Sequence, residues 1–186
     1  MIIKLQKVLS DIEISINEAS SHYEIWWALG YSENRNKYRD VFDHEDFNYF
    51  LHTSYIANQM AMLMALSRSF DDIPSTSNIR SLKLLLTQGG FEDLSKVISE
   101  TLSPHQNIVK KIKDIRCNLI AHTDSSQTDQ KVLARNGIKP DEIKELIESV
   151  KEALIKVTTS LRVHNLCYKK GFHNESTLKV LEKLKV

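Results

Sequence analysis

The sequence predicts an all-α fold, an antiparallel bundle of about four long helices with shorter helices between them. The 186 residues include only five Gly and three Pro, and so few chain breakers favour long helices over strands and turns. Apolar residues recur at alternating steps of three and four, which is the period of a helix that buries one face. The 41% of hydrophobic residues is ordinary for a globular protein, and we expect a single domain over residues 1–186.

The first predicted helix runs from Ile2 to Gly30, where the glycine is expected to end it. Its apolar stripe consists of Ile2, Leu5, Leu9, Ile12, Ile16, Ala19, Tyr23 and Trp26. A second helix is predicted from about Asp46 to Phe70. Because it is apolar on nearly every side, we expect it to be a central helix packed by several neighbours.

Shorter helices follow the turn predicted at residues 71–77. One covers 78–88 and stops at Gly89-Gly90, and another covers 92–102. Ser103-Pro104 has the N-cap and first-turn residues of a helix that is expected to reach His122. Residues 124–130 are polar and loop-like, and 131–135 are expected to add one helical turn.

The last long helix is predicted to begin at Pro140 and to continue to about Leu161. A loop at 169–174 and an amphipathic helix at 176–185 complete the chain. A surplus apolar stripe on the first or the last long helix would be the place for a dimer contact. No run of about 18 apolar residues predicts a membrane span, and no signal peptide is recognised, so we expect a cytoplasmic protein.

The formal net charge of +1 excludes a strongly basic protein that coats nucleic acids, although not an enzyme that contacts a few phosphates. Cys117 and Cys167 form no C-x-x-C pair and are expected to be free thiols. The neighbouring acidic and histidine residues at 44–52 match no standard ligand spacing, so no metal is expected. No glycine-rich phosphate loop is present, and no cofactor is expected.

One segment carries the clearest functional pattern in the chain. It reads Asp114-Ile115-Arg116-Cys117-Asn118-Leu119-Ile120-Ala121-His122-Thr123-Asp124. An Arg separated from a His by five residues resembles the signature of the HEPN superfamily, and the Ala-His-x-Asp ending resembles the AbiU group of abortive phage-infection proteins. The segments 65–71 and 81–85 are also similar to that group, and the resemblance covers roughly Ile12 to Leu161.

The resemblance implies a metal-independent RNase whose two subunits build one composite site. His122 would be the general acid or base, because a neutral imidazole titrates near working pH. Arg116 would hold the phosphate, because a guanidinium stays charged while negative charge builds up. Asn118 and Asp124 would support them by hydrogen bonding, and Arg68 would lie beside the site.

The spacing of the motif predicts a homodimer. Six helical steps leave Arg116 and His122 about 120° apart around the helix and roughly 9 Å apart along it. One straight helix therefore does not bring both side chains to a point. Pairing two such helices about a two-fold axis would let Arg116 of one chain approach His122 of the other.

The chain departs from the family pattern at two positions. Cys117 replaces the polar residue that usually follows the Arg, which puts nuclease activity in question. HEPN toxins that are silenced by a nucleotidyltransferase antitoxin carry a Tyr two residues after the His, where this chain has Asp124. That mode of regulation is therefore not expected, although another antitoxin protein remains a possible partner.

Three functions stay open at this point. The first is an RNase effector of phage defence or of a toxin–antitoxin system. The second is a catalytically silent HEPN module that binds RNA, a nucleotide or a protein, and the third is a purely structural dimerisation module. The simplest structural role for Arg116 is an ion pair with Asp114 or a neighbouring carboxylate, and for Arg68 an exposed ion pair with Asp71.

Overall fold

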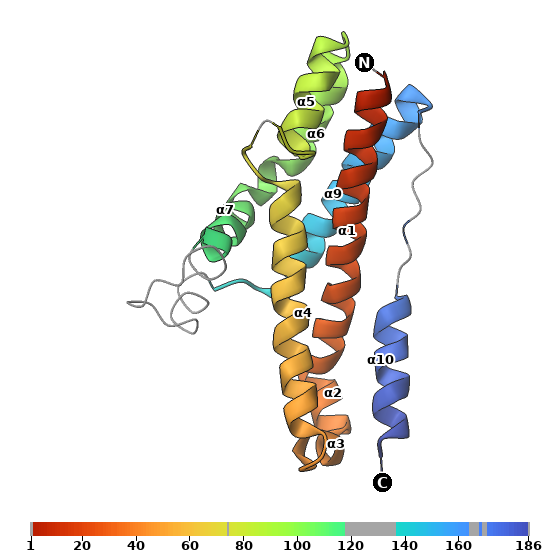
Figure 1. The fold of residues 1–186 in the computed structure, drawn as a ribbon. Coiled ribbons are helices and arrows are strands. Elements are labelled where there is room, and N and C mark those ends of the chain that lie inside the picture. Colours follow the sequence, from red (N-terminus) through yellow and green to blue (C-terminus); the bar gives the residue numbers. More distant parts are fainter. Residues whose placement is uncertain (1, 74, 118–136, 164–167, 169–170, 186) are drawn as a thin grey trace.

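The computed structural model describes residues 2–73, 75–117, 137–163, 168 and 171–185, which form helices and turns without a strand. Three long helices dominate: α1 (Ile2–Gly30), α4 (Asn48–Ser69) and α9 (Pro140–Leu161). Helices α1 and α4 lie side by side and antiparallel, and α9 crosses behind α1 (Figure 1). The predicted all-α bundle is confirmed.

Short helices lie at both ends of the long α1–α4 pair (Figure 1). Helices α2 (Ser32–Lys37) and α3 (Arg39–Asp43) connect α1 to α4 and were not predicted. At the other end of the pair are α5 (Ile79–Gln88) and α6 (Glu92–Leu102). A 3₁₀ turn at Ser103–His105 leads into α7 (Gln106–Ile115), and α10 (Phe172–Lys183) packs along α1.

The main core is built from the faces that the apolar periodicity predicts. Leu9, Ile12 and Ile16 of α1 are fully buried against residues of α4 and α9, such as Leu66 and Leu154. Burying each side chain of this size contributes roughly 1.5–3 kcal/mol before conformational entropy is subtracted. Among the described residues, no helix is long and apolar enough to cross a membrane.

Gly30 ends α1 as predicted, but its small size matters for packing rather than for a left-handed backbone. The described glycines with positive φ are Gly90, Gly137 and Gly171, and Gly30 is not among them. A Cβ at Gly30 would lie only 2.6 Å from Cε2 of Tyr55 in α4. A side chain at position 30 would therefore force the Tyr55 ring to move.

The expectation that α4 is surrounded by neighbours is wrong for its first half. The Tyr49, Phe50 and Ile56 side chains are 81%, 67% and 42% exposed, respectively. Burial is concentrated in the second half, where Met62 and Leu66 are fully buried. Periodicity did not reveal this difference, because an exposed and a buried apolar stripe look the same in sequence.

Two helix starts also differ from the prediction. Helix α10 begins at Phe172 rather than near 176, because the Glu24 carboxylate of α1 accepts hydrogen bonds from backbone N–H groups at its start. Ser103 does not cap α7; its hydroxyl donates to the Glu100 carbonyl oxygen at 3.0 Å. In contrast, α5 and α6 begin and end within one residue of the predicted bounds.

The turn that leads from α4 to α5 is held in place by Asn78. The Asn78 side chain accepts a hydrogen bond from the Ser81 backbone N–H at 2.8 Å, and the Ser81 hydroxyl accepts one from the Asn78 backbone N–H. This reciprocal capping box fixes the start of α5. The Asn78 amide also donates to the Ile73 carbonyl oxygen at 2.9 Å, which connects α5 to the turn that contains Asp71 and Asp72.

Candidate functional site

Arg116 follows directly after α7, at the end of a helix that is anchored by buried isoleucines. Ile108, Ile112 and Ile115 of α7 are at most 4% exposed and lie in the main core. The Arg116 guanidinium donates from Nη1 to Oδ2 of Asp71 at 3.1 Å. The Arg116 side chain remains 35% exposed, whereas Asp71 is 14% exposed. The arginine of the motif is thus held at the surface by a carboxylate from the α4–α5 turn.

A second, parallel ion pair joins the same turn to α7. Lys113 Nζ donates to Oδ2 of Asp72 at 2.8 Å. Lys113 and Arg116 are three residues apart, so they lie on the same side of the helix. Exposed pairs of this kind contribute about 0–1 kcal/mol, too little to hold the fold together. The two ion pairs instead determine where the side chains lie, because the adjacent carboxylates Asp71 and Asp72 hold Arg116 and Lys113 on the same side of the helix.

The pairing leaves Arg116 with hydrogen-bonding capacity. A guanidinium carries five N–H donors, and one of them is used by Asp71. The other oxygen of Asp71 accepts from the Ile73 backbone N–H at 3.3 Å, which holds the carboxylate in the turn. An arginine fixed along one edge and exposed along another is suited to binding a phosphate oxygen.

The other residues of the predicted site have different outcomes. Asn118, His122 and Asp124 lie outside the described residues, and their roles stay predictions. Arg68 forms an ion pair with Glu18 of α1, so the predicted Arg68–Asp71 ion pair is wrong. Periodicity could not reveal this, because the Arg68 partner is 50 residues away in the sequence.

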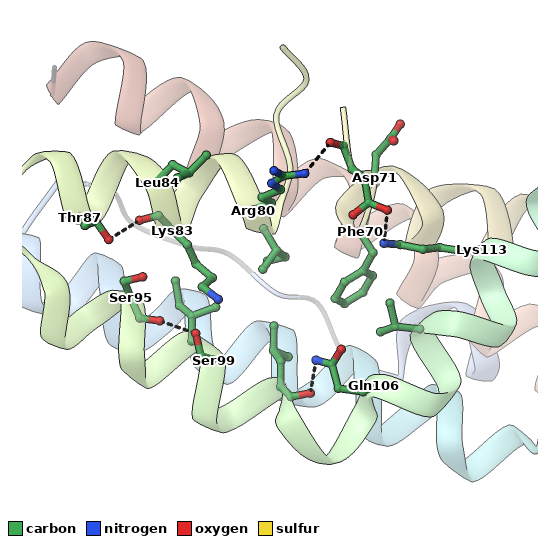
Figure 2. Close-up of a pocket in the computed structure, with 15 residues that line it drawn as sticks. Phe70, Asp71, Arg80, Lys83, Leu84, Thr87, Ser95, Ser99, Gln106 and Lys113 are labelled. Carbon is green, nitrogen blue, oxygen red and sulfur yellow. Dashed lines mark hydrogen bonds and ion pairs between the residues drawn. The ribbon is translucent and has the colours of Figure 1, made fainter. Parts of the chain in front are cut away.

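A groove with a cavity volume of about 500 Å³ lies beside the two ion pairs (Figure 2). Its walls come from α5, α6, α7 and the α4–α5 turn, and it includes Arg80, Lys83 and Lys113. Sequence reasoning missed Arg80 and Lys83. The available signal was their spacing with Thr87, which places all three on one face of α5.

A comparison with known families confirms the resemblance to the AbiU group. The family model HEPN_AbiU2, described as AbiU2, matches residues 2–173. The chain belongs to the AbiU2 family. The match extends beyond the part of the chain on which the resemblance rested and includes every described helix from α1 to α9. Neither a curated protein nor a solved structure matches this AbiU2 chain.

Membership of the AbiU2 family makes this chain a HEPN domain of the abortive-infection type. Within this domain, the described half of the Arg-to-His motif ends at Cys117, whose side chain is exposed. The structure thus places Arg116 at the surface, beside a groove and in contact with Asp71.

Proposed function

We propose that this AbiU2 protein is a metal-independent endoribonuclease that acts as an effector of phage defence or of a toxin–antitoxin system. The observation that carries the proposal is the state of Arg116: its Nη1 donates to Asp71, and its side chain remains 35% exposed. Such a guanidinium can donate hydrogen bonds to a phosphate without a rearrangement of its side chain. Stabilisation of a developing negative charge requires donors that are positioned in advance. Family membership supports the same reading.

The proposed reaction is a transesterification within the RNA strand. His122 removes the proton from a ribose 2′-hydroxyl, and the 2′-oxygen attacks the adjacent phosphorus. The bond from phosphorus to the 5′-oxygen breaks, and that oxygen takes up a proton from an acid, for which a second His122 is available in a dimer. The products are a 2′,3′-cyclic phosphate and a 5′-hydroxyl, while Arg116 holds the non-bridging oxygens.

The site is proposed to be completed by a second copy of the chain. A two-fold axis near the ends of the two α7 helices would bring Arg116 of one subunit towards His122 of the other. Light scattering over a concentration series should give the mass of a dimer. The charge reversal Arg116→Glu should weaken the dimer or abolish cleavage. A strict monomer at tens of micromolar would exclude the composite site.

A cleavage assay tests the proposed function directly. The purified protein is incubated with total RNA in the presence of EDTA, and the fragment ends are analysed for 2′,3′-cyclic phosphate. We expect cleavage that is insensitive to EDTA and that is lost in His122→Ala. Cleavage that EDTA abolishes and divalent ions restore would contradict the metal-independent mechanism. Cleavage that persists in His122→Ala would point to another site or to a contaminating nuclease.

A catalytically silent module that binds RNA is the second candidate, and one observation favours it. Cys117 occupies the position of the usual polar residue, and its side chain is exposed beside Arg116. RNA binding without cleavage would support this reading. The substitution Cys117→Asn separates the two candidates further: an active enzyme should keep or raise its cleavage rate, whereas a silent module should show no cleavage with either residue.

A further inference from the structure

The groove beside Arg116 combines an apolar floor with cations at its rim. Its floor is lined by buried side chains from α5, α6, α7 and the residue that follows α4, namely Ile79, Ile98, Leu102, Val109 and Phe70. In Figure 2 the Phe70 ring reaches into the groove between α5 and α7. A volume of about 500 Å³ is in the range of pockets that hold small organic ligands. The floor is therefore large enough for a flat ring system.

Lys83 contributes a positive charge to the groove. Its side chain is half-buried, and Figure 2 shows its amine pointing into the space between α5 and α6. Among the described residues, its Nζ makes no hydrogen bond or ion pair, whereas Lys113 and Arg80 both contact Asp72. An ammonium group that points into a groove and has no protein partner is available to an anionic ligand.

The charges along the groove favour an anion. Arg80, Lys83 and Lys113 face two carboxylates, Asp71 and Asp72, so the lining carries one excess positive charge. Arg116 lies one helical turn beyond Lys113 and adds another cation at the end of the groove. The cations thus form a row that begins inside the groove and ends at the motif.

The third feature of the groove is a set of hydroxyl groups on α6. Ser99 donates its hydroxyl to the Ser95 carbonyl oxygen at 2.9 Å, which leaves its oxygen lone pairs free to accept. Both serines are half-buried and line the groove. A hydroxyl-bearing ligand such as a ribose can donate to an oxygen placed in this way.

We infer that this groove is the subsite for a nucleotide next to the scissile phosphate of a single-stranded RNA. The base packs on the apolar floor against Phe70, the phosphate contacts Lys83, and the ribose lies near Ser99. The inference rests on the proposed ribonuclease function, because Arg116 marks the position of the scissile phosphate. The inference implies that the RNA substrate is single-stranded, because a base within a duplex cannot enter such a groove.

The test measures binding and cleavage separately. Binding uses a fluorescent single-stranded RNA oligonucleotide that is fully 2′-O-methylated, so that it cannot be cut by attack of the 2′-oxygen. The variants are Lys83→Ala and, as a matched control, Lys96→Ala, which removes an exposed lysine of α6 outside the groove. Circular dichroism melting verifies that each variant folds like the wild type.

The expected result is a change in the salt dependence of binding. Each phosphate contact to a single strand contributes about 0.7 to the slope of log affinity against log salt concentration. Lys83→Ala should therefore lower this slope by about 0.7, and Lys96→Ala should leave it unchanged. Equal slopes for Lys83→Ala and the wild type, or no RNA binding by the wild type, would overturn the inference.

A second variant tests the groove itself rather than its charge. Ser99→Phe fills the groove and keeps every cation, so it should weaken RNA binding at least severalfold. Free nucleoside monophosphates, added as competitors, distinguish a site for single nucleotides from one that needs a strand. Competition at concentrations comparable to those of the oligonucleotide would show that the groove serves free nucleotides, contrary to the inference.

The outcomes also separate this inference from the proposed function. If the wild type binds RNA through Lys83 but never cleaves it, the groove is an RNA-binding site and the proposed ribonuclease activity is wrong. If cleavage occurs with the same KM in Lys83→Ala as in the wild type, the proposed ribonuclease activity is supported. The groove is then excluded as a substrate-binding site.

Discussion

Two carboxylates connect distant parts of the chain, and they do so in different ways. Glu24 of α1 accepts hydrogen bonds at 2.7 Å and 2.9 Å from the backbone N–H groups of Gly171 and His173, at the start of α10. Asp71 accepts a hydrogen bond at 3.1 Å from the side chain of Arg116, after the end of α7. Both contacts cross more than 40 residues of sequence.

The difference between the two contacts indicates which one is structural. Glu24 satisfies N–H groups that every helix leaves unpaired at its start, and those groups are fixed by the helix. The Asp71 partner is a side chain that retains other donors and remains exposed. The Glu24 contact is therefore a helix cap, whereas the Asp71 contact holds a cation that remains partly exposed.

The largest expected effect is on Arg116 itself. Arg116→Ala should lower the rate of RNA cleavage by about two orders of magnitude or more, because charge stabilisation in the transition state is lost. The melting temperature should stay close to that of the wild type. Arg39→Ala, which removes an exposed arginine of α3, is the matched control and should cleave normally. Near-normal cleavage by Arg116→Ala would place the site elsewhere.

A smaller effect is expected from Asp71→Asn, which keeps the shape of the side chain but removes its charge. Because a misplaced catalytic group is costly, kcat should fall about tenfold. The affinity for RNA should rise, since one negative charge beside the groove is gone. Steady-state kinetics that show a decrease in both kcat and KM would identify Asp71 as a positioning residue. If neither parameter changes, the ion pair has no role in activity.

The Glu24 contact should affect stability and leave activity intact. Losing a capping acceptor costs about 1 kcal/mol, which lowers the melting temperature of a chain of this size by about 2–4 °C. Calorimetry of Glu24→Ala should show this decrease. Glu24→Gln keeps one acceptor oxygen and should lose less. If Glu24→Ala cleaves RNA more slowly at a temperature where it is folded, the contrast between the two carboxylates is wrong.

The smallest expected effect concerns a local cap at the start of α9. The Glu142 carboxylate accepts from the Lys139 backbone N–H at 2.9 Å, and this hydrogen bond lowers the pKa of Glu142 below its ordinary value of 4.5. The lowered pKa adds stability above pH 4.5, and this stability is lost as the pH falls through the folded-state pKa.

Urea unfolding of the wild type and of Glu142→Gln measures this contribution. Near neutral pH the wild type should be more stable by less than about 1 kcal/mol. At a pH well below the folded-state pKa, the two proteins should have the same free energy of unfolding. A difference that persists in acid would mean that the Glu142 side chain stabilises α9 by packing rather than by its charge.

The sequence by itself determined most of the helical segments, although not α2 and α3. Helices α1, α5, α6 and α9 follow from apolar periodicity, from Pro140 and from the glycines at 89–90. It also determined where function is expected, because the Arg116-to-His122 motif is a pattern of neighbouring residues. These features depend on local backbone preferences and on one buried face per helix, both of which are written in short stretches of sequence.

Only the tertiary structure decided which side chains meet. Asp71, 45 residues away in the sequence, is a carboxylate partner of Arg116, and Lys83 lines a groove formed with α6 and α7. The start of α10 depends on Glu24, and the exposed first half of α4 depends on which helices pack nearby. Each of these outcomes is a contact between residues far apart in sequence, where helical periodicity carries no information.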